Sequence, residues 1–120
     1  MEIRIYETAQ EASKAGAKLI ADVIKSQEST VLGLATGSTP VGMYDEWARM
    51  NATGELDFAT VSSFNLDEYI GLDGTHDQSY RYFMNKNLFD NINIKKENTN
   101  VPDGQAKDTE AEGNRYEALI

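Results

Sequence analysis

Hydrophobic positions along the chain switch between two periods, which predicts strands separated by helices. Residues 2–6 alternate polar and apolar side chains, a pattern typical of an edge or half-buried strand. Residues 8–26 instead repeat apolar side chains every three or four positions, and Thr8 followed by Glu11 forms a capping box at the start of this helix. The apolar run 31–34 predicts a strand buried on both faces.

The same alternation continues along the rest of the chain. Pro40 suits the first position of a second helix, whose apolar face includes Trp47 as a packing residue and which closes before the breaker cluster at 51–54. A further strand is predicted over residues 58–65. The remaining elements are a helix capped by Asp77, a short strand at 99–101 and a last helix opened by Asp108. This order predicts an α/β fold with an open, mostly parallel sheet and right-handed crossovers.

Small hydroxyl and glycine residues follow the strand at 31–34 and form a candidate phosphate site. Gly37 lets the backbone turn before Pro40, so that amides at the helix start, with the hydroxyls of Thr36, Ser38 and Thr39, can hold a phosphate. The alternative is that the small residues serve close packing and that Thr39 caps the helix. The segment contains neither of the standard phosphate-loop motifs, which disfavours nucleotide binding.

Two acidic residues follow the next strand, at the position where parallel α/β sheets bind ligands. If the two strands are neighbours, a phosphate on the first loop places a small substrate within reach of Asp67 and Glu68. A carboxylate there can act as a general base. Adjacent residues of an extended segment point to opposite sides, so the pair is not expected to form a close dyad, and the alternative is that both are solvated surface acids.

Composition narrows the range of partners. The 120 residues suffice for one domain, and a net charge of -9 disfavours nucleic acid and anionic membranes as partners. The chain has no cysteine, no apolar run approaching the roughly 20 residues of a membrane span and no signal peptide, which predicts a cytoplasmic protein. His76, the only histidine, is interpreted as a solvated loop residue or a local hydrogen-bond partner, and no metal-ligand spacing is present.

Three segments together resemble the N-terminal half of the glucosamine-6-phosphate deaminase family. They are residues 32–40 (LGLATGSTP), 64–72 (FNLDEYIGL) and 76–80 (HDQSY), in the order and spacing of that family. The resemblance implies a Rossmann-like three-layer α/β/α fold. It also implies conversion of glucosamine 6-phosphate and water to fructose 6-phosphate and ammonia without a redox cofactor.

The same resemblance assigns roles to residues of the two loops. It implies that Thr36 to Thr39 hold the phosphate of an amino-sugar phosphate, and that Asp67 moves a proton between C2 and C1 of the opened sugar. Glu68 and Tyr69 are secondary candidates. No cofactor and no metal are expected, and a homo-oligomer is compatible with the sequence.

Part of the family's site has no counterpart in this chain. The family's ring-opening histidine lies in a Gly-x-Asp-Gly-His-x-x-Phe-Asn-Glu-Pro type segment of its second half, and His76 does not stand in that context. The last helix also ends on Ala118-Leu119-Ile120 without a cap. We therefore expect residues 1–120 to be a single α/β domain, the N-terminal portion of a larger one, and to be inactive alone.

Two alternative functions belong to the same architecture. A 6-phosphogluconolactonase-type hydrolase usually continues its acidic motif with arginine, where this chain has Tyr69. A non-catalytic sugar-phosphate-sensing domain of a transcription regulator would follow DNA-binding helices, whereas Met1 leads directly into the first predicted strand. Both are ranked below the deaminase.

Overall fold

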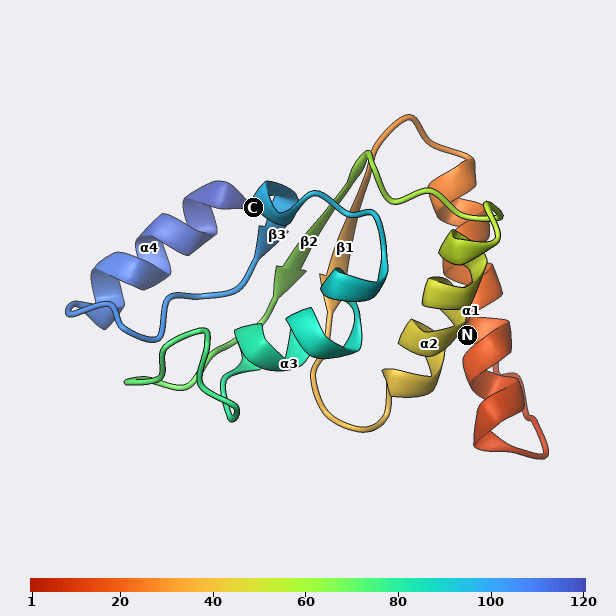
Figure 1. The fold of residues 1–120 in the computed structure, drawn as a ribbon, viewed down its shortest axis with the longest axis horizontal. Coiled ribbons are helices and arrows are strands. Elements are labelled where there is room, and N and C mark those ends of the chain that lie inside the picture. The colour runs from red at the N-terminus through yellow and green to blue at the C-terminus, as the bar shows by residue number, and fades with distance from the viewer.

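A three-stranded parallel sheet forms the centre of the molecule in a computed structural model that describes all 120 residues (Figure 1). The strands are β1 (Thr30–Leu34), β2 (Val61–Asn65) and β3 (Thr99–Asn100), side by side in that order. β1 and β2 pair in register over their whole length, from Thr30 opposite Val61 to Leu34 opposite Asn65. Their carboxyl ends therefore meet at one edge of the sheet.

Helices cover the two faces of this sheet. The helices are α1 (Ala9–Lys25), α2 (Val41–Ala52), α3 (Tyr80–Asn87) and α4 (Thr109–Leu119), with the short 3-10 helices Phe89–Asn91 and Lys96–Asn98. Buried side chains of α1, α2 and α3 share one core with Val61 of β2. Phe64, three residues after Val61 in β2, points to the other face of the sheet. Its ring packs edge-on against that of Tyr116 of α4, with ring centroids 5.9 Å apart. The fold is thus a Rossmann-like α/β/α arrangement of three layers.

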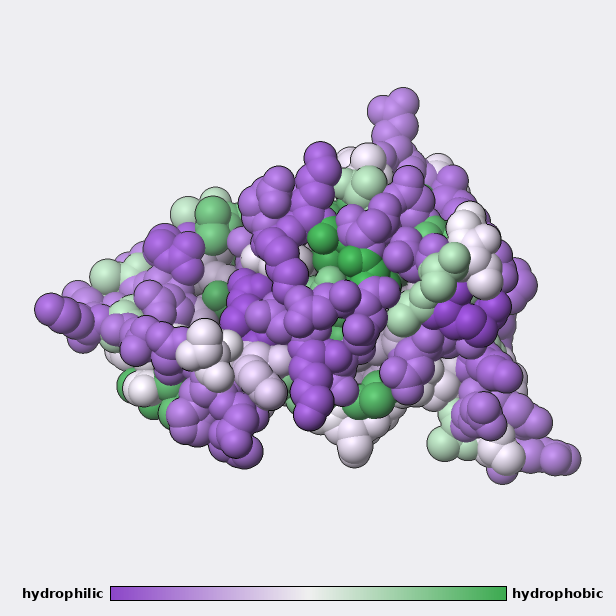
Figure 2. All heavy atoms as spheres, in the orientation of Figure 1, coloured by the Kyte–Doolittle hydropathy of each residue, from purple (hydrophilic) through white to green (hydrophobic).

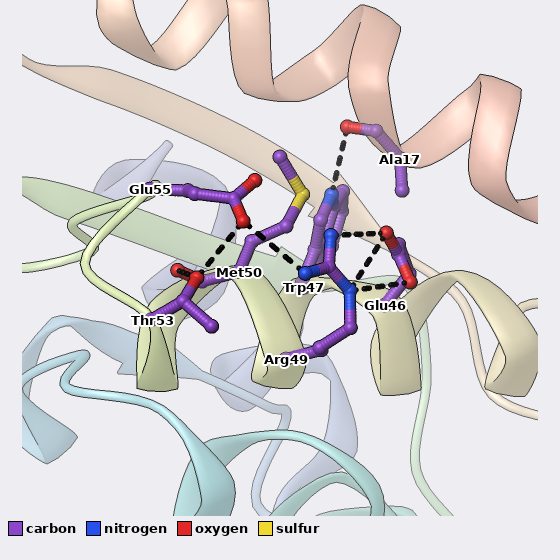
Figure 3. A network of polar contacts seen from close by, with 7 residues as sticks. All are labelled: Ala17, Glu46, Trp47, Arg49, Met50, Thr53 and Glu55. Carbon is purple, nitrogen blue, oxygen red and sulfur yellow. Dashed lines mark hydrogen bonds and ion pairs between the residues drawn. The ribbon is translucent and has the colours of Figure 1, made fainter.

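Trp47 lies at the centre of the core between α1 and α2. Its side chain is fully buried, lies 5.7 Å from the ring of Tyr44 and 5.9 Å from that of Phe58, and donates a hydrogen bond from Nε1 to the Ala17 carbonyl at 3.1 Å (Figure 3). Ala17 and Ala21 are also fully buried, and their small side chains let the two helices approach closely. The predicted packing role of Trp47 is confirmed.

Local hydrogen bonds explain where the helices begin. Thr8 caps α1 by accepting a hydrogen bond from the Glu11 amide at 3.1 Å, and Asp108 caps α4 by accepting one from Ala111 at 3.0 Å, both as predicted. The predicted cap of α3 is wrong, because Ser79 rather than Asp77 occupies that position, and its hydroxyl accepts from the Tyr82 amide.

The predicted strand over residues 2–6 is also wrong. These residues form no strand, and Ile3 and Ile5 expose 71% and 91% of their surface. A strand needs a neighbour for its backbone amides and carbonyls, and none of the three strands pairs with this segment. Alternation of polar and apolar residues alone therefore gave a wrong strand prediction. The first regular element of the chain is α1.

Polar side chains cover most of the face shown in Figure 2. Hydrophobic residues appear near the centre of this face and in smaller areas toward its left and lower edges. None of the helices combines the length and the apolar surface that a membrane crossing demands.

Replacing Trp47 tests the core. Trp47→Ala is expected to lower the free energy of unfolding by about 3–5 kcal/mol, because it leaves a large cavity and removes the hydrogen bond to Ala17. Guanidinium chloride unfolding measures this loss. Lys18→Ala is the control, since that side chain is 74% exposed and its replacement is expected to change stability by no more than about 0.5 kcal/mol. Equal effects of the two substitutions would contradict the central role of Trp47.

Candidate functional site

The loops that follow β1 and β2 leave the same edge of the sheet (Figure 1). Leu34 and Asn65, the last residues of the two strands, lie opposite each other, and the buried Asn65 donates from Nδ2 to the Leu34 carbonyl at 3.0 Å. The condition that the two strands are neighbours, on which the predicted site depends, is confirmed. The segment Thr36 to Thr39 and the segment around Asp67 therefore begin side by side.

The first loop leaves its backbone amides free at the start of α2. Gly37 has a φ of +90°, in the left-handed region that glycine adopts without strain, and it turns the chain toward the helix. Pro40 occupies the cap position rather than the first helical position, and no side chain caps this helix, so the capping alternative for Thr39 is wrong. Gly37, Ser38 and Thr39 are exposed, and their amides take no part in the backbone hydrogen bonds of the turn. Free amides at a helix N-terminus suit an anion.

Ser38 and Thr39 also line a groove between α1 and α2. This groove has a volume of about 400 Å³ and includes Ser13, Lys14 and Arg49. Arg49 pairs with Glu46 at 2.7 Å and with Glu55 at 3.2 Å, as Figure 3 shows. Lys14 is therefore the cation of this groove that carries no ion pair.

Asp67 lies just beyond β2 and is exposed. Together with Leu66, Ile70 and Tyr116 it lines a cavity of about 360 Å³ between the edge of the sheet and α4. Glu68 lines a different cavity, of about 200 Å³, so the two carboxylates do not form a close dyad, as expected. Glu68 accepts four hydrogen bonds through its carboxylate, whereas the Asp67 carboxylate accepts none. The Asp67 carboxylate is therefore open to a ligand.

Glu68 joins its own loop to the start of α3. Its two carboxylate oxygens accept four hydrogen bonds of 2.8–3.0 Å. The donors are the backbone amides of Tyr69, Tyr80 and Arg81 and the hydroxyl of Ser79. Burial disfavours the charged carboxylate, but these hydrogen bonds outweigh it and hold the pKa of Glu68 below its ordinary value. Glu68 is thus occupied as an acceptor and not free to react.

Tyr80 packs against the second loop, a contact that sequence reasoning missed. Its ring lies 4.7 Å from that of Tyr69. The neighbouring Tyr69 hydroxyl, burial and the charge of Asp67 raise the pKa of Tyr80, while the hydroxyl of Thr36 acts in the opposite direction. The Tyr80 ring therefore lies beside the loop that carries Asp67. The sequence contained one signal for this contact, because Tyr80 directly follows Ser79 in the segment 76–80. Helical periodicity instead assigned Tyr80 to the apolar face of its helix.

His76 has a local role. It is exposed, its Nδ1 accepts a hydrogen bond from the Gln78 amide at 3.0 Å, and the same atom lies 3.4 Å from Asp77. The interpretation of His76 as a solvated loop residue with local partners is confirmed. No three histidine, aspartate or glutamate side chains lie close enough together to share a metal ion.

Comparison with known proteins identifies relatives over the whole chain. Residues 5–120 match the family model described as glucosamine-6-phosphate isomerases/6-phosphogluconolactonase. A glucosamine-6-phosphate deaminase of Clostridium perfringens (strain SM101 / Type A) is 58% identical and one of Thermoanaerobacter sp. (strain X514) is 52% identical. Both alignments cover 100% of this chain, but 50% and 47% of those proteins. The chain thus spans about half the length of the curated relatives it matches.

Solved structures agree with these relatives. A monomeric glucosamine-6-phosphate deaminase superposes with a TM-score of 0.96 at 41% identity, over 100% of this chain and 50% of that one. A 6-phosphogluconolactonase from Thermotoga maritima superposes with a TM-score of 0.76 at 17% identity, over 98% of this chain and 51% of that one. The second likeness shows the fold alone.

The hydrogen bonds of Glu68 predict how stability depends on pH. Its pKa in the folded chain lies below the ordinary value of 4.5, so its stabilising effect is present above that value and is lost as the pH falls through the lower folded value. The difference in unfolding free energy between the protein and Glu68→Gln is therefore expected to shrink between about pH 6 and about pH 3. Urea unfolding at several pH values measures it.

Asp77→Asn is the control for this experiment. The Asp77 side chain is 75% exposed and contacts only His76, so its replacement is expected to have a small effect at every acid pH. A Glu68→Gln difference that is constant with pH would contradict the assignment.

Proposed function

The chain belongs to the family of glucosamine-6-phosphate isomerases and 6-phosphogluconolactonases, and we propose that the whole protein is a glucosamine-6-phosphate deaminase. One observation carries the proposal. The free amides of Thr36 to Thr39 and the open carboxylate of Asp67 lie at the ends of two strands paired in register. The named deaminases at 58% and 52% identity support the choice within the family.

The proposed chemistry needs an anchored phosphate and a base. The phosphate of glucosamine 6-phosphate binds the amides and hydroxyls of residues 36–39, with the positive end of α2 behind them. Asp67 then takes the proton from C2 of the opened sugar and returns it to C1, while a proton of the amine passes to the C1 oxygen, which leaves an imine at C2. Water adds to this imine and ammonia leaves, so that C2 becomes the carbonyl carbon. The products are fructose 6-phosphate and ammonia, so the reaction hydrolyses a carbon–nitrogen bond. Anchoring one end of the sugar keeps C2 near the base.

We further propose that residues 1–120 form the N-terminal portion of a larger domain and do not turn over substrate alone. The chain covers half of the related deaminases, and the ring-opening segment that the resemblance implies is not among these residues. A cytoplasmic amino-sugar pathway is the proposed setting. The sequence is compatible with a homo-oligomer, whereas a similar solved structure is that of a monomeric deaminase.

The lactonase alternative has weaker support. The 6-phosphogluconolactonase from Thermotoga maritima shares only 17% identity with this chain. Tyr69 stands where the lactonase motif usually has arginine, and its ring packs against Tyr80 at the candidate site. A sensing domain without catalysis gains no support from the named relatives, which are enzymes.

Asp67→Asn in the full-length protein tests the proposed base. We expect kcat for ammonia release to fall by about 1000-fold, because a positioned general base contributes about 100- to 10,000-fold. Exchange of the C2 proton with deuterium from the solvent should fall with it. Asp73→Asn is the control, since Asp73 lies on the same loop but accepts only local hydrogen bonds from Thr75. An active Asp67→Asn enzyme would remove Asp67 from the mechanism.

Thr39→Val tests the phosphate site. The substitution keeps the shape of the side chain and removes the hydroxyl, so KM for glucosamine 6-phosphate should rise by about tenfold with little change in kcat, as loss of one hydrogen bond to a charged group predicts. Thr53→Val is the control, because its hydroxyl donates to the Met50 carbonyl at the other end of α2. Equal KM values for the two variants would place the phosphate elsewhere.

A further inference from the structure

The loop that carries Asp67 is held at three points. At its start, the buried Asn65 bonds through its side chain to Leu34 of β1, and its carbonyl accepts a hydrogen bond from the Tyr116 hydroxyl at 2.7 Å. In its middle, Glu68 accepts four hydrogen bonds, three of them from the residues that begin α3. Asp67 lies between these first two points.

The third point is Gly104. Its carbonyl accepts a hydrogen bond from the Gly71 amide at 2.6 Å, at the far end of the loop. A Cβ at this position would overlap the Tyr69 carbonyl, so only glycine allows the two segments to lie this close. The loop is therefore fixed against the turn that follows β3.

The residues that Glu68 binds are themselves fixed to the sheet. Arg81 donates to the Thr99 hydroxyl at 2.7 Å and to the Thr99 carbonyl at 3.1 Å, and Thr99 belongs to β3. Ser79 is 1% exposed, so its bond to Glu68 is shielded from water. A rigid path thus leads from β3 through the start of α3 to Glu68, next to Asp67.

We propose that Glu68 is a positioning residue that sets the place of the Asp67 carboxylate and of Tyr80 relative to the phosphate loop. The proposal rests on the proposed deaminase function, for which Asp67 is the base. Glu68 touches no substrate in this scheme, because its two oxygens are filled by Tyr69, Ser79, Tyr80 and Arg81. It acts through the geometry of its neighbours.

A residue of this kind affects the chemical step more than substrate binding. The phosphate binds the loop after β1 in this scheme. None of the four hydrogen bonds of Glu68 comes from that loop, so loss of Glu68 leaves that anchor intact. The base, in contrast, moves with its loop. A misplacement of about 1 Å is enough to cost about 100-fold in rate.

The test uses Glu68→Gln in the full-length protein. Glutamine has one acceptor oxygen, and its amide hydrogens face the donors that the carboxylate bound. We expect kcat to fall by about 10- to 100-fold with KM changed by no more than about threefold. The kinetic isotope effect with deuterium at C2 of glucosamine 6-phosphate should rise, because proton transfer becomes slower relative to the other steps.

Hydrogen exchange supplies a readout that does not depend on activity. Gly71 makes no bond to Glu68, yet it shares the loop, so its amide should exchange at least about tenfold faster in Glu68→Gln. Ser79→Ala removes one of the four donors and should change every readout in the same direction by less. This variant decides the matter if Glu68→Gln does not fold.

Asp57→Asn is the matched control. Asp57 also accepts hydrogen bonds, from Ala59 at 2.8 Å and Asn93 at 2.7 Å, but it lies before the amino end of β2, away from the site. It should leave kcat, the isotope effect and the Gly71 exchange unchanged.

The outcomes separate the two proposals. Unchanged kcat or unchanged Gly71 exchange in both Glu68→Gln and Ser79→Ala would overturn the positioning role, as would a KM that rises as much as kcat falls. Absence of deaminase activity in the unsubstituted protein would overturn the proposed function, and the Gly71 exchange would still show whether Glu68 holds the loop.

Discussion

The in-register parallel pairing of β1 with β2 is the constraint on which the rest of the structure depends. Leu34 lies opposite Asn65, so the loops that follow β1 and β2 start at the same edge of the sheet. In the sequence these loops are separated by α2 and its connections. A shift of one residue would turn the Asn65 side chain to the other face and break its bond to Leu34. The buried amide of Asn65 therefore supports both the register and the site built on it.

The neighbouring carboxylates of Asp67 and Glu68 differ in whether they are open to a ligand, because their surroundings differ. Glu68 lies where amides of Tyr80 and Arg81 converge, and it is held in its charged form as part of the scaffold. Asp67, one residue earlier, faces a cavity beside α4. The division allows one carboxylate to stay open to a ligand while the next fixes the loop. Such a division is common where a reactive group needs a rigid support.

The likeness to deaminases and the geometry support one another from different directions. The relatives at 58% and 52% identity are named glucosamine-6-phosphate deaminases, but their names do not assign a role to any residue of this chain. The structure indicates which groups are free and which are occupied, but not which sugar phosphate binds. The proposed function therefore combines the names of the relatives with the exposed amides of residues 37–39 and the unpaired carboxylate of Asp67.

The sequence alone determined the elements whose causes are local. Helical periodicity and the caps Thr8 and Asp108 predicted α1 and α4, and apolar runs predicted β1 and β2, since these depend on neighbours a few residues away. Tertiary structure decided the rest. Residues 2–6 alternate like a strand but have no partner. Only contacts between distant segments show that Glu68 binds α3, that Tyr80 packs against Tyr69 and that Gly104 lies close to Tyr69. Pairing and close approach join segments far apart in the chain, so no local pattern records them.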